Sequence, residues 1–562
     1  MPDGSLVEVD ELTFRYRRAT EPAIRNVTLS IEPGEVLLVA GPSGCGKSTL
    51  IRALNGLIPH SYRGEISGSV RIDGSSTMEL RLRDLARLVG TVLQDPRKQL
   101  VASTVRGELA FGPENLGVPA AEINATLQTV VARAEIQHLA GRTTDQLSGG
   151  ESQQVAIAGT LMLAPRLVVL DEPLANLDPL AAQRLLSLVR SLADEGTAVV
   201  IVEHRVEDAL QATPDRVLYL DAGSVRYLGE LDGFFRVADP ASVKVPFEIA
   251  LARARERTIE GPEAHEPGSS NPPAEPEVPR LEWRGVRASY DDRAVLHDVT
   301  SSLGARQTVA VLGPNGSGKT TLFKTAIGLV PRDAGDVLVD GSSIEGRSVA
   351  DLVGTFGYVF QNPSQMLFAR NVREELIFGP RNLGRDEAGF DALIAGVLRR
   401  VGLDEEADIL DRPPLTLSFG QQKRLALAVA LALEPRTLVL DEPSAGQDHR
   451  SATAFMTEVQ RIAGLESVYF VTHDADLALT YADRILLLRE GRIVADGSPL
   501  EVIADRERWI SCNLRFTSLM EANARWGGHT GRFMGTAGLA EWVAATPDST
   551  GGLTTLEERA SS

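Results

Sequence analysis

The strongest constraint on the fold is a glycine-rich segment that occurs twice. Gly41-Pro42-Ser43-Gly44-Cys45-Gly46-Lys47-Ser48-Thr49 returns 272 residues later as Gly313-Pro314-Asn315-Gly316-Ser317-Gly318-Lys319-Thr320-Thr321. Two other segments return in the same order, with offsets of 270 and 267 residues: Leu170–Pro173 as Leu440–Pro443, and Phe111–Gly117 as Phe378–Gly384. A nearly constant offset predicts two copies of one domain of about 240 residues, which is large enough to bury its own core.

Composition sets the limits of these domains. We predict the first over residues 1–245 and the second over 280–505. Residues 246–279 are predicted to be a Pro/Glu-rich linker, because 260–279 holds six prolines and five glutamates without periodic apolar residues. Residues 506–562 form a C-terminal tail to which the sequence assigns no role.

Charge and cysteine content exclude several classes of protein. The formal net charge of −19 argues against a protein that coats nucleic acid, so no nucleic-acid partner is expected. The two cysteines, Cys45 and Cys512, cannot form a disulfide framework or a zinc site. The N-terminus lacks a basic segment followed by an apolar one, and the longest apolar run, 425–433, is far shorter than the roughly 20 residues that cross a bilayer. We therefore expect a cytoplasmic protein.

Short apolar runs alternate with helix-like segments in each copy. In the first copy Val36–Ala40 leads directly into the glycine-rich segment, and Leu167–Leu170 and Ala198–Val202 are similar runs. Continuous apolar runs of this length are typical of buried parallel strands. The order predicts an α/β fold, with a mostly parallel sheet flanked by helices in each domain.

The repeated glycine-rich segment matches the pattern GxxxxGK[ST] of a P-loop, which binds the phosphates of ATP. Glycines allow backbone N–H groups to turn toward phosphate oxygens, and the following helix N-terminus adds positive charge. Lys47 and Lys319 are predicted to reach the β- and γ-phosphates, while Ser48 and Thr320 are predicted to ligate Mg²⁺. The other predicted ATP-binding residues of the two loops are Gly41, Ser43, Gly44, Gly46, Thr49, Gly313, Asn315, Gly316, Gly318 and Thr321.

An acidic pair follows an apolar run in each copy. Asp171 lies 124 residues after Lys47, and Asp441 lies 122 residues after Lys319. Each aspartate is predicted to hold Mg²⁺ through water. The glutamate beside it, Glu172 or Glu442, is predicted to orient or deprotonate the attacking water.

A third segment, Leu147-Ser148-Gly149-Gly150-Glu151, lies just before the first acidic pair, and its counterpart is Leu417-Ser418-Phe419-Gly420-Gln421. With these residues the sequence resembles the ATP-binding-cassette (ABC) ATPases, whose signature is LSGGQ at this place. The resemblance implies ABC-type P-loop domains, each with an added helical subdomain. Glu151 in place of Gln, and Phe419 in place of the first Gly, depart from the family pattern.

The resemblance implies further site residues. Gln94 and Gln361 match the Q-loop, which contacts Mg²⁺ or water, and Asp178 and Asp448 match the D-loop. His204 and His473 match the switch histidine that contacts the γ-phosphate. Tyr16 and Tyr290 match the aromatic residue that stacks on adenine. In this family the domains pair head to tail, so Ser148 and Gly150 would complete the ATP site of the second copy, and Ser418 and Gly420 that of the first. The bulk of Phe419 predicts that the site it closes is the weaker of the two.

One stretch points to a subtype. Gln94–Leu100 with Glu108–Leu116, and Gln361–Phe368 with Glu375–Pro380, resemble the ATPases of energy-coupling factor importers. That resemblance implies uptake of a vitamin, a vitamin precursor, or cobalt or nickel. It also implies a separate transmembrane scaffold protein, a separate substrate-binding membrane subunit, and a peripheral position on the inner face of the cell membrane.

Two other interpretations remain open at this point: a duplicated ABC ATPase that acts on ribosomes, and the fused ATPase of another class of importer. A ribosomal factor usually has a long charged helical linker, whereas residues 246–279 are proline-rich and acidic. Fused sugar-importer ATPases commonly have one degraded P-loop, whereas both P-loops are intact here. A DNA-repair ABC ATPase would need zinc-binding cysteines that this chain lacks.

Overall fold

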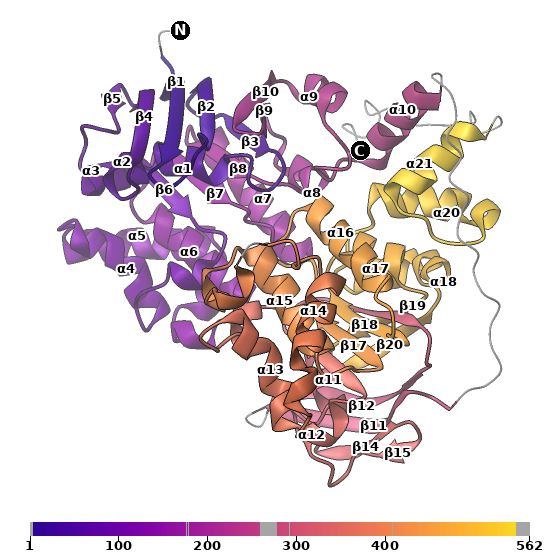
Figure 1. Cartoon of the computed structure of the whole chain (residues 1–562). Helices are drawn as coiled ribbons and strands as arrows, with labels where there is room; N and C mark the ends of the chain where they lie inside the picture. The colour runs from indigo at the N-terminus through magenta and orange to yellow at the C-terminus, as the bar shows by residue number, and fades with distance from the viewer. Residues whose placement is uncertain are drawn as a thin grey trace. The chain divides into compact units, whose positions relative to one another are not determined.

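A computed structural model describes residues 4–175, 177, 179–258, 278–290, 293–406 and 408–546. The chain divides into two compact units (Figure 1). Unit 1 comprises residues 1–245 with 448–450, and unit 2 comprises residues 246–447 with 451–562. No helix among the described residues is long and apolar enough to span a bilayer.

Unit 1 contains a small antiparallel sheet and a larger sheet that is mostly parallel. The small sheet has the order β2-β1-β4-β5, with β1 (Val7–Tyr16), β2 (Ile24–Ile31), β4 (Gly64–Ile72) and β5 (Ser75–Ser76). The large sheet has the order β10-β9-β3-β8-β7-β6, with β3 (Val36–Ala40), β6 (Val89–Val92), β7 (Leu167–Asp171), β8 (Ala198–Val202), β9 (Arg216–Asp221) and β10 (Ser224–Gly229). Strands β6 to β9 run parallel, and only β10 is antiparallel to its neighbour.

The helices of unit 1 connect these strands and form the helical subdomain. They are α1 (Lys47–Leu54), α2 (Leu57–His60), α3 (Leu82–Leu88), α4 (Val105–Asn115), α5 (Ala120–Arg133), α6 (Gly149–Leu161), α7 (Pro179–Asp194), α8 (Val206–Ala209) and α9 (Leu231–Val237). The predicted fold class is confirmed. All five residues of β3 and of β8 are buried, because a central parallel strand is covered on both faces.

Unit 2 repeats this plan. Its small sheet has the order β12-β11-β14-β15, with β11 (Leu281–Tyr290), β12 (Arg293–Leu303), β14 (Ala334–Val339) and β15 (Ser342–Ser343). Its large sheet has the order β16-β17-β18-β13-β19-β20, with β13 (Thr308–Leu312), β16 (Phe356–Val359), β17 (Thr437–Asp441), β18 (Ser467–Thr472), β19 (Arg484–Arg489) and β20 (Arg492–Gly497).

Unit 2 has more helices than unit 1 because it carries an extension. Its helices are α10 (Phe247–Thr258), α11 (Lys319–Ala326), α12 (Val349–Leu352), α13 (Val372–Asn382), α14 (Phe390–Arg400), α15 (Phe419–Leu431), α16 (His449–Gln460), α17 (Ala475–Tyr481), α18 (Pro499–Ala504), α19 (Arg506–Ser511), α20 (Ser518–Thr530) and α21 (Thr536–Ala545). The predicted linker therefore begins with a helix, α10, that belongs to unit 2. Residues 259–277 of that linker and 547–562 of the predicted tail lie outside the described residues.

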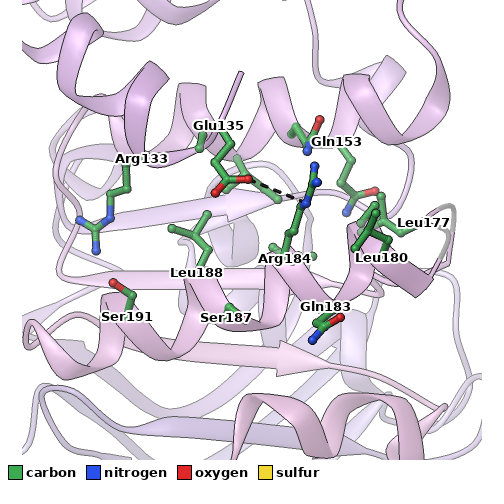
Figure 2. Close-up of a pocket in the computed structure, with 15 residues that line it drawn as sticks. Arg133, Glu135, Gln153, Leu177, Leu180, Gln183, Arg184, Ser187, Leu188 and Ser191 are labelled. Carbon is green, nitrogen blue, oxygen red and sulfur yellow. Dashed lines mark ion pairs between the residues drawn. The ribbon is translucent and has the colours of Figure 1, made fainter. Parts of the chain in front are cut away.

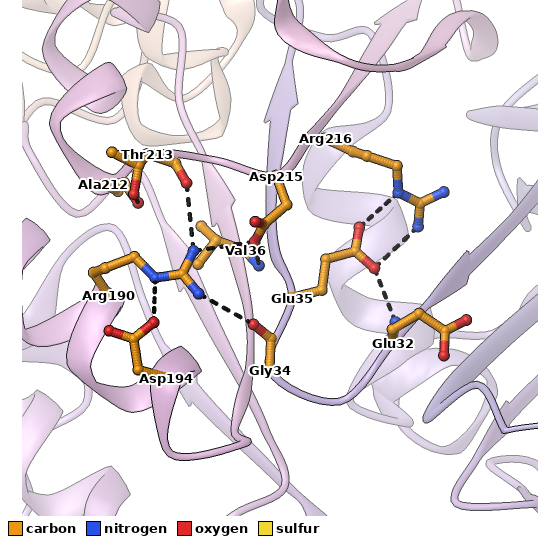
Figure 3. A network of polar contacts seen from close by, with 10 residues as sticks. All are labelled: Glu32, Gly34, Glu35, Val36, Arg190, Asp194, Ala212, Thr213, Asp215 and Arg216. Carbon is orange, nitrogen blue, oxygen red and sulfur yellow. Dashed lines mark hydrogen bonds and ion pairs between the residues drawn. The ribbon is translucent and has the colours of Figure 1, made fainter. Parts of the chain in front are cut away.

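An ionic network holds the start of the P-loop strand in unit 1 (Figure 3). Arg216 donates two hydrogen bonds to the buried carboxylate of Glu35, at 2.7 and 3.0 Å. Arg190 donates to Asp215 at 3.1 Å, and the same Asp215 oxygen accepts from the backbone N–H of Val36 at 2.8 Å. The network fixes the loop before β3. The glycine-rich loop, which follows the other end of β3, therefore starts from a fixed position.

Candidate nucleotide sites

The glycine-rich loop of each unit joins the end of a buried strand to a helix. It lies between β3 and α1 in unit 1, and between β13 and α11 in unit 2. The glycine before each helix has a positive φ, 105° at Gly46 and 100° at Gly318. A Cβ atom at Gly46 would lie 2.6 Å from the carbonyl oxygen of Ala23, so only glycine fits there. The loop therefore places the helix N-terminus and the lysine side by side.

The P-loop lysines are buried within their loops. The Lys47 ammonium donates to the carbonyl oxygens of Gly41 at 2.6 Å and Pro42 at 2.9 Å. In unit 2, Lys319 donates to the equivalent carbonyls of Gly313 and Pro314 at 2.8 and 2.9 Å. Both units thus hold the cation at the mouth of the loop, where the phosphates of a nucleotide would lie.

The acidic pair stands at the carboxyl end of the neighbouring strand. Asp171 ends β7 and Asp441 ends β17, and burial raises the pKa of both carboxyls. In unit 2, the Thr320 hydroxyl donates to one oxygen of Asp441 at 2.9 Å, and Tyr358 donates to the other at 2.9 Å. A hydroxyl and a carboxylate this close fit a Mg²⁺ ion that takes most of its ligands from water and phosphate.

The following glutamates have strained backbones. Glu172 has φ 46° and Glu442 has φ 50°, in a left-handed region that costs an ordinary residue about 1 kcal/mol or more. The backbone N–H of Glu172 donates to the carbonyl oxygen of Val202 in β8, and that of Glu442 donates to the carbonyl oxygen of Val471 in β18. These bonds fix both glutamates at the carboxyl ends of the parallel strands.

The two glutamates have different side-chain partners. Gln94 donates to Glu172 at 2.5 Å, while Nδ1 of His204 lies 3.8 Å from Glu172. Burial, opposed by Lys47, raises the pKa of Glu172 to about 7. In unit 2, Nδ1 of His473 lies 2.9 Å from Glu442. Burial would raise the pKa of Glu442, but His473 and Lys319 together outweigh burial and lower it.

The switch histidines both follow the strand next to β7 or β17. His204 follows β8 and is buried, and burial together with Arg205 and Lys47 lowers the pKa of its imidazole to about 3. His204 is therefore neutral near pH 7. Glu172 lies near His204 in unit 1 and Glu442 near His473 in unit 2, and the P-loop lysine of the same unit acts to lower the pKa of each glutamate. How the two copies contribute to one site stays a prediction.

The signature segments form helix N-termini. Ser148 caps α6: its hydroxyl accepts from the N–H of Glu151 at 3.3 Å, and the Glu151 carboxylate accepts from the N–H of Ser148 at 2.7 Å. Gln421 does the same for Ser418 at α15. A glutamate thus serves the capping box as well as the family's glutamine, and Arg142 pairs with Glu151 at 2.7 Å. Phe419, the other residue that departs from the family pattern, is the first residue of α15 and is 42% exposed.

The remaining predicted residues lie at the margins of these sites. The Tyr16 hydroxyl is 3.2 Å from the Thr49 hydroxyl and accepts from Arg52 at 2.7 Å, whereas Tyr290 is exposed at the end of β11. Gln361 is exposed after β16. The loop residues Ser43, Gly44, Asn315 and Gly316 are likewise exposed, and Asp448 is buried just before α16. Asp178 lies outside the described residues.

Sequence reasoning missed Tyr358, Arg52 and Tyr62. Tyr358 bonds to Asp441, and Arg52 bonds to Tyr16 and lies over the Tyr62 ring at 4.3 Å. The only available signal for Tyr358 was a polar side chain on a buried strand. The first copy has Thr91 at that position, so comparing the two copies shows no shared pattern there.

Unit 1 also has a cavity of 520 Å³ among α5, α6 and α7 (Figure 2). None of the residues that line this cavity belongs to the P-loop. Gln153, Leu185 and Leu188 line it, and an ion pair of Arg184 with Glu135 at 3.8 Å crosses it. In unit 2 the positions equivalent to Gln153 and Leu185 hold the longer Lys423 and Phe455. Lys423 reaches the carbonyl oxygens of Pro443 and Ala445. At these two positions the first copy therefore has shorter side chains than the second.

Comparison with known proteins agrees with this geometry. The family profile described as ABC transporter matches residues 24–175 and 296–445. The chain is 32% identical over 549 residues to "Putative ABC transporter ATP-binding protein" of Vibrio parahaemolyticus, covering 93% of this chain and 94% of that protein. It is 36% identical over 539 residues to a protein of the same description from Methanosarcina acetivorans, covering 89% and 87%.

Among solved structures, the chain is similar to cbiO1 from Clostridium perfringens, described as part of the ABC transporter complex cbiONQ. The identity is 30% and the TM-score 0.38, over 45% of this chain and 99% of that one. Two P-loops, two acidic pairs and two capped signature helices agree with the family profile and with relatives that match almost end to end. The chain therefore belongs to the ATP-binding proteins of ABC transporters and is an ATPase with two tandem ABC domains.

Proposed function

We propose that this ATPase is the energising subunit of a membrane importer of the energy-coupling factor type, which takes up a vitamin, a vitamin precursor or a transition-metal ion. Its partners would be a separate transmembrane scaffold protein and a substrate-binding membrane subunit, which would hold it on the inner face of the cell membrane. The observation that carries the proposal is an exposed apolar patch, built alike in both units, on the segment that resembles those importers.

The patch is held by one glutamate in each unit. In unit 1, the Glu108 carboxylate accepts from the N–H groups of Val101 and Ala102 at 2.8 and 2.7 Å. In unit 2, Glu375 accepts from Phe368 and Ala369, both at 2.8 Å. The shared glutamate of the motif is therefore a clamp that fixes the loop before α4 or α13.

The clamped loops present apolar side chains to solvent. Val101 is 63% exposed and Phe111 48% in unit 1, while Phe368 is 64% exposed and Phe378 48% in unit 2. The rings of Phe368 and Phe378 meet edge to face at 4.8 Å. An apolar patch of this kind is typical of a surface that binds a partner. Because it follows the Q-loop, its partner would sense the state of the nucleotide.

The chemistry of the proposal is the hydrolysis of ATP. Mg²⁺ would be held by Ser48 or Thr320, by Asp171 or Asp441 through water, and by Gln94 or Gln361. It would neutralise charge on the phosphates. Lys47 and Lys319 would bind the β- and γ-phosphates, and Glu172 and Glu442 would orient the attacking water. In this proposal the signature serine of each copy covers the ATP bound by the other, so that ATP binding closes the two domains and hydrolysis reopens them.

The test replaces the patch and leaves the ATP sites untouched. A tagged chain with Val101→Arg, Phe111→Arg, Phe368→Arg and Phe378→Arg is produced in its own host and purified from detergent-solubilised membranes. The wild type should bring down a multi-span membrane protein, and the variant should lose it while the purified variant hydrolyses ATP at the wild-type rate. Leu329→Arg, which changes an apolar residue that is 44% exposed after α11, is the matched control. Recovery with ribosomes and without membrane proteins would reject the proposal.

A further inference from the structure

The polypeptide leaves unit 1 through an exit segment, residues 243–245, that contacts the loop carrying the switch histidine His204. The backbone N–H of Lys244 donates to the carbonyl oxygen of His204 at 3.0 Å, and the carbonyl of Lys244 accepts from the N–H of Glu207 at 3.0 Å. Val243 and Val245, on either side, are buried. Lys244 in the exit segment is thus hydrogen-bonded both to His204, in the loop between β8 and α8, and to Glu207, at the start of α8.

The second copy has a similar exit segment. Leu514-Arg515-Phe516 precedes α20 as Val243-Lys244-Val245 precedes α10. Just after it, the Thr517 hydroxyl donates to the Asp476 carboxylate at 2.6 Å, and both residues are buried. Asp476 follows His473 by three residues, as Glu207 follows His204. Lys244 within the first exit segment, and Thr517 next to the second, therefore contact the position three residues after the switch histidine.

The helix that follows the first exit segment is built into unit 2. The N–H of Phe247, the first residue of α10, donates to the Ser518 hydroxyl at 2.8 Å. Phe247 and Leu251 are buried in the same apolar core as Leu539 and Val543 of α21. The Phe247 ring lies 6.1 Å from the Trp526 ring. Only Val245 and Pro246 separate the residue that holds His204 from the helix anchored in unit 2.

From these contacts we propose that the two exit segments are positioning elements for the switch histidines, and that α10 joins them mechanically. Lys244 positions the His204 loop, and Thr517 positions the His473 loop through Asp476. Because α10 is covalently continuous with Lys244, displacement of unit 2 pulls on the His204 loop. The inference rests on the proposed role of both histidines in ATP hydrolysis.

The first experiment loosens the connection without removing any contact. Gly-Ser-Gly-Ser is inserted between Val245 and Pro246 of the full chain, and the matched control carries the same insertion between Ala264 and His265. Both insertions are made in a Glu442→Gln chain, so that single-turnover hydrolysis reports the site of Glu172 and His204. The rate should fall about fivefold in the first variant, with ATP affinity unchanged. The control should hydrolyse ATP at the rate of the Glu442→Gln chain without an insertion. Equal rates for the two insertions would overturn the mechanical link.

The second experiment concerns the copy-two contact. Thr517→Val removes the hydroxyl that binds Asp476, and Thr517→Ser restores it. We expect a lower kcat with unchanged KM for the valine variant and a normal kcat for the serine variant. A valine variant with normal kcat, or a serine variant as impaired as the valine variant, would overturn the positioning role.

His204→Ala in the same Glu442→Gln chain tests the switch role by itself. If His204→Ala leaves single-turnover hydrolysis intact, the proposed switch role fails, and the positioning inference falls with it. If His204→Ala abolishes hydrolysis while the insertion after Val245 does not lower the rate, only the inference about the exit segment fails.

Discussion

At the scale of single residues, the glutamates of the two acidic pairs, Glu172 and Glu442, differ more than their sequences suggest. Both have a positive φ, but Glu442 is buried and Glu172 only partly buried, and Glu172 is hydrogen-bonded to Gln94 while Glu442 is hydrogen-bonded to His473. The pKa of Glu172 is raised to about 7 by burial, whereas that of Glu442 is lowered by its histidine together with Lys319. The two sites should therefore respond differently to pH and to mutation.

The pH dependence follows from the sign of each shift. A carboxyl with a pKa near 7 is mostly ionised only above pH 7. If Glu172 acts as the base, its site therefore loses activity as the pH falls. In a Glu442→Gln variant, single-turnover hydrolysis should rise about tenfold from about pH 6 to pH 8. In a Glu172→Gln variant, the rate should be flat over the same range, because Glu442 is ionised throughout. Identical profiles in rapid-quench measurements would contradict this assignment.

The signature residue Phe419 predicts unequal sites. It stands where the family has a glycine, and it belongs to the segment expected to cover ATP bound at Lys47 and Glu172. We expect Glu442→Gln to lower steady-state ATPase more than Glu172→Gln, because Glu442 serves the stronger site. Unchanged ATPase in Glu442→Gln, with activity abolished in Glu172→Gln, would reverse the order.

The residues that could be predicted are those whose chemistry is tied to one side-chain type. The turn before α1 admits only glycine at Gly46, and the phosphates call for Lys47, so both left a pattern in the sequence. Tyr358 could be recognised only as a polar side chain on a buried strand, and the first copy has Thr91 there, so the two copies share no pattern at that position. The pKa of Glu172 was also beyond prediction, since it depends on burial by residues distant in sequence.

At the scale of elements, the helices behind the signature segments depend on their caps. Ser148 and Glu151 form a reciprocal pair at the start of α6, with Arg142 bound to Glu151. The same pairing of Ser418 with Gln421 begins α15. This is why Glu151 departs from the family pattern without loss of the local structure.

Removing the cap should cost measurable stability. Ser148→Ala leaves N–H groups of the first turn of α6 unpaired and should lower the free energy of unfolding of the full chain by about 1 kcal/mol. Glu151→Gln, the matched control, keeps the capping box and loses only the ion pair with Arg142, so the expected change is under about 0.5 kcal/mol. The check is urea unfolding followed by circular dichroism. A larger loss for Glu151→Gln than for Ser148→Ala would contradict the capping account.

Strand runs such as Val36–Ala40 and Ala198–Val202 were predictable because a strand covered on both faces is apolar throughout. Helix α10 was not, because its composition is charged and only four apolar residues, Phe247, Ala250, Leu251 and Ala254, face the core of unit 2. Its place depends on α21, which lies nearly 300 residues later in the chain. No local pattern records such a contact.

At the scale of the whole molecule, the duplication gives one chain two ABC domains, each with the sequence motifs predicted to bind a nucleotide. Each unit has its own P-loop, acidic pair and switch histidine, and the C-terminal extension together with α10 adds a helical layer to unit 2 alone. The two halves therefore differ in their surroundings as well as in Phe419 and the Glu172 pKa. The alternatives of a ribosomal factor or another importer class share these sites, so only the partner of the exposed patch distinguishes them.

The central claim is that both P-loops bind Mg·ATP and that the chain hydrolyses it through them. The direct test is steady-state ATPase of the purified full chain with Lys47→Ala and Lys319→Ala combined, alongside a melting curve that shows the variant to be folded. We predict that turnover falls to background while the fold is kept, since the two lysines are expected to bind the β- and γ-phosphates. Full turnover in the folded double variant would contradict the account.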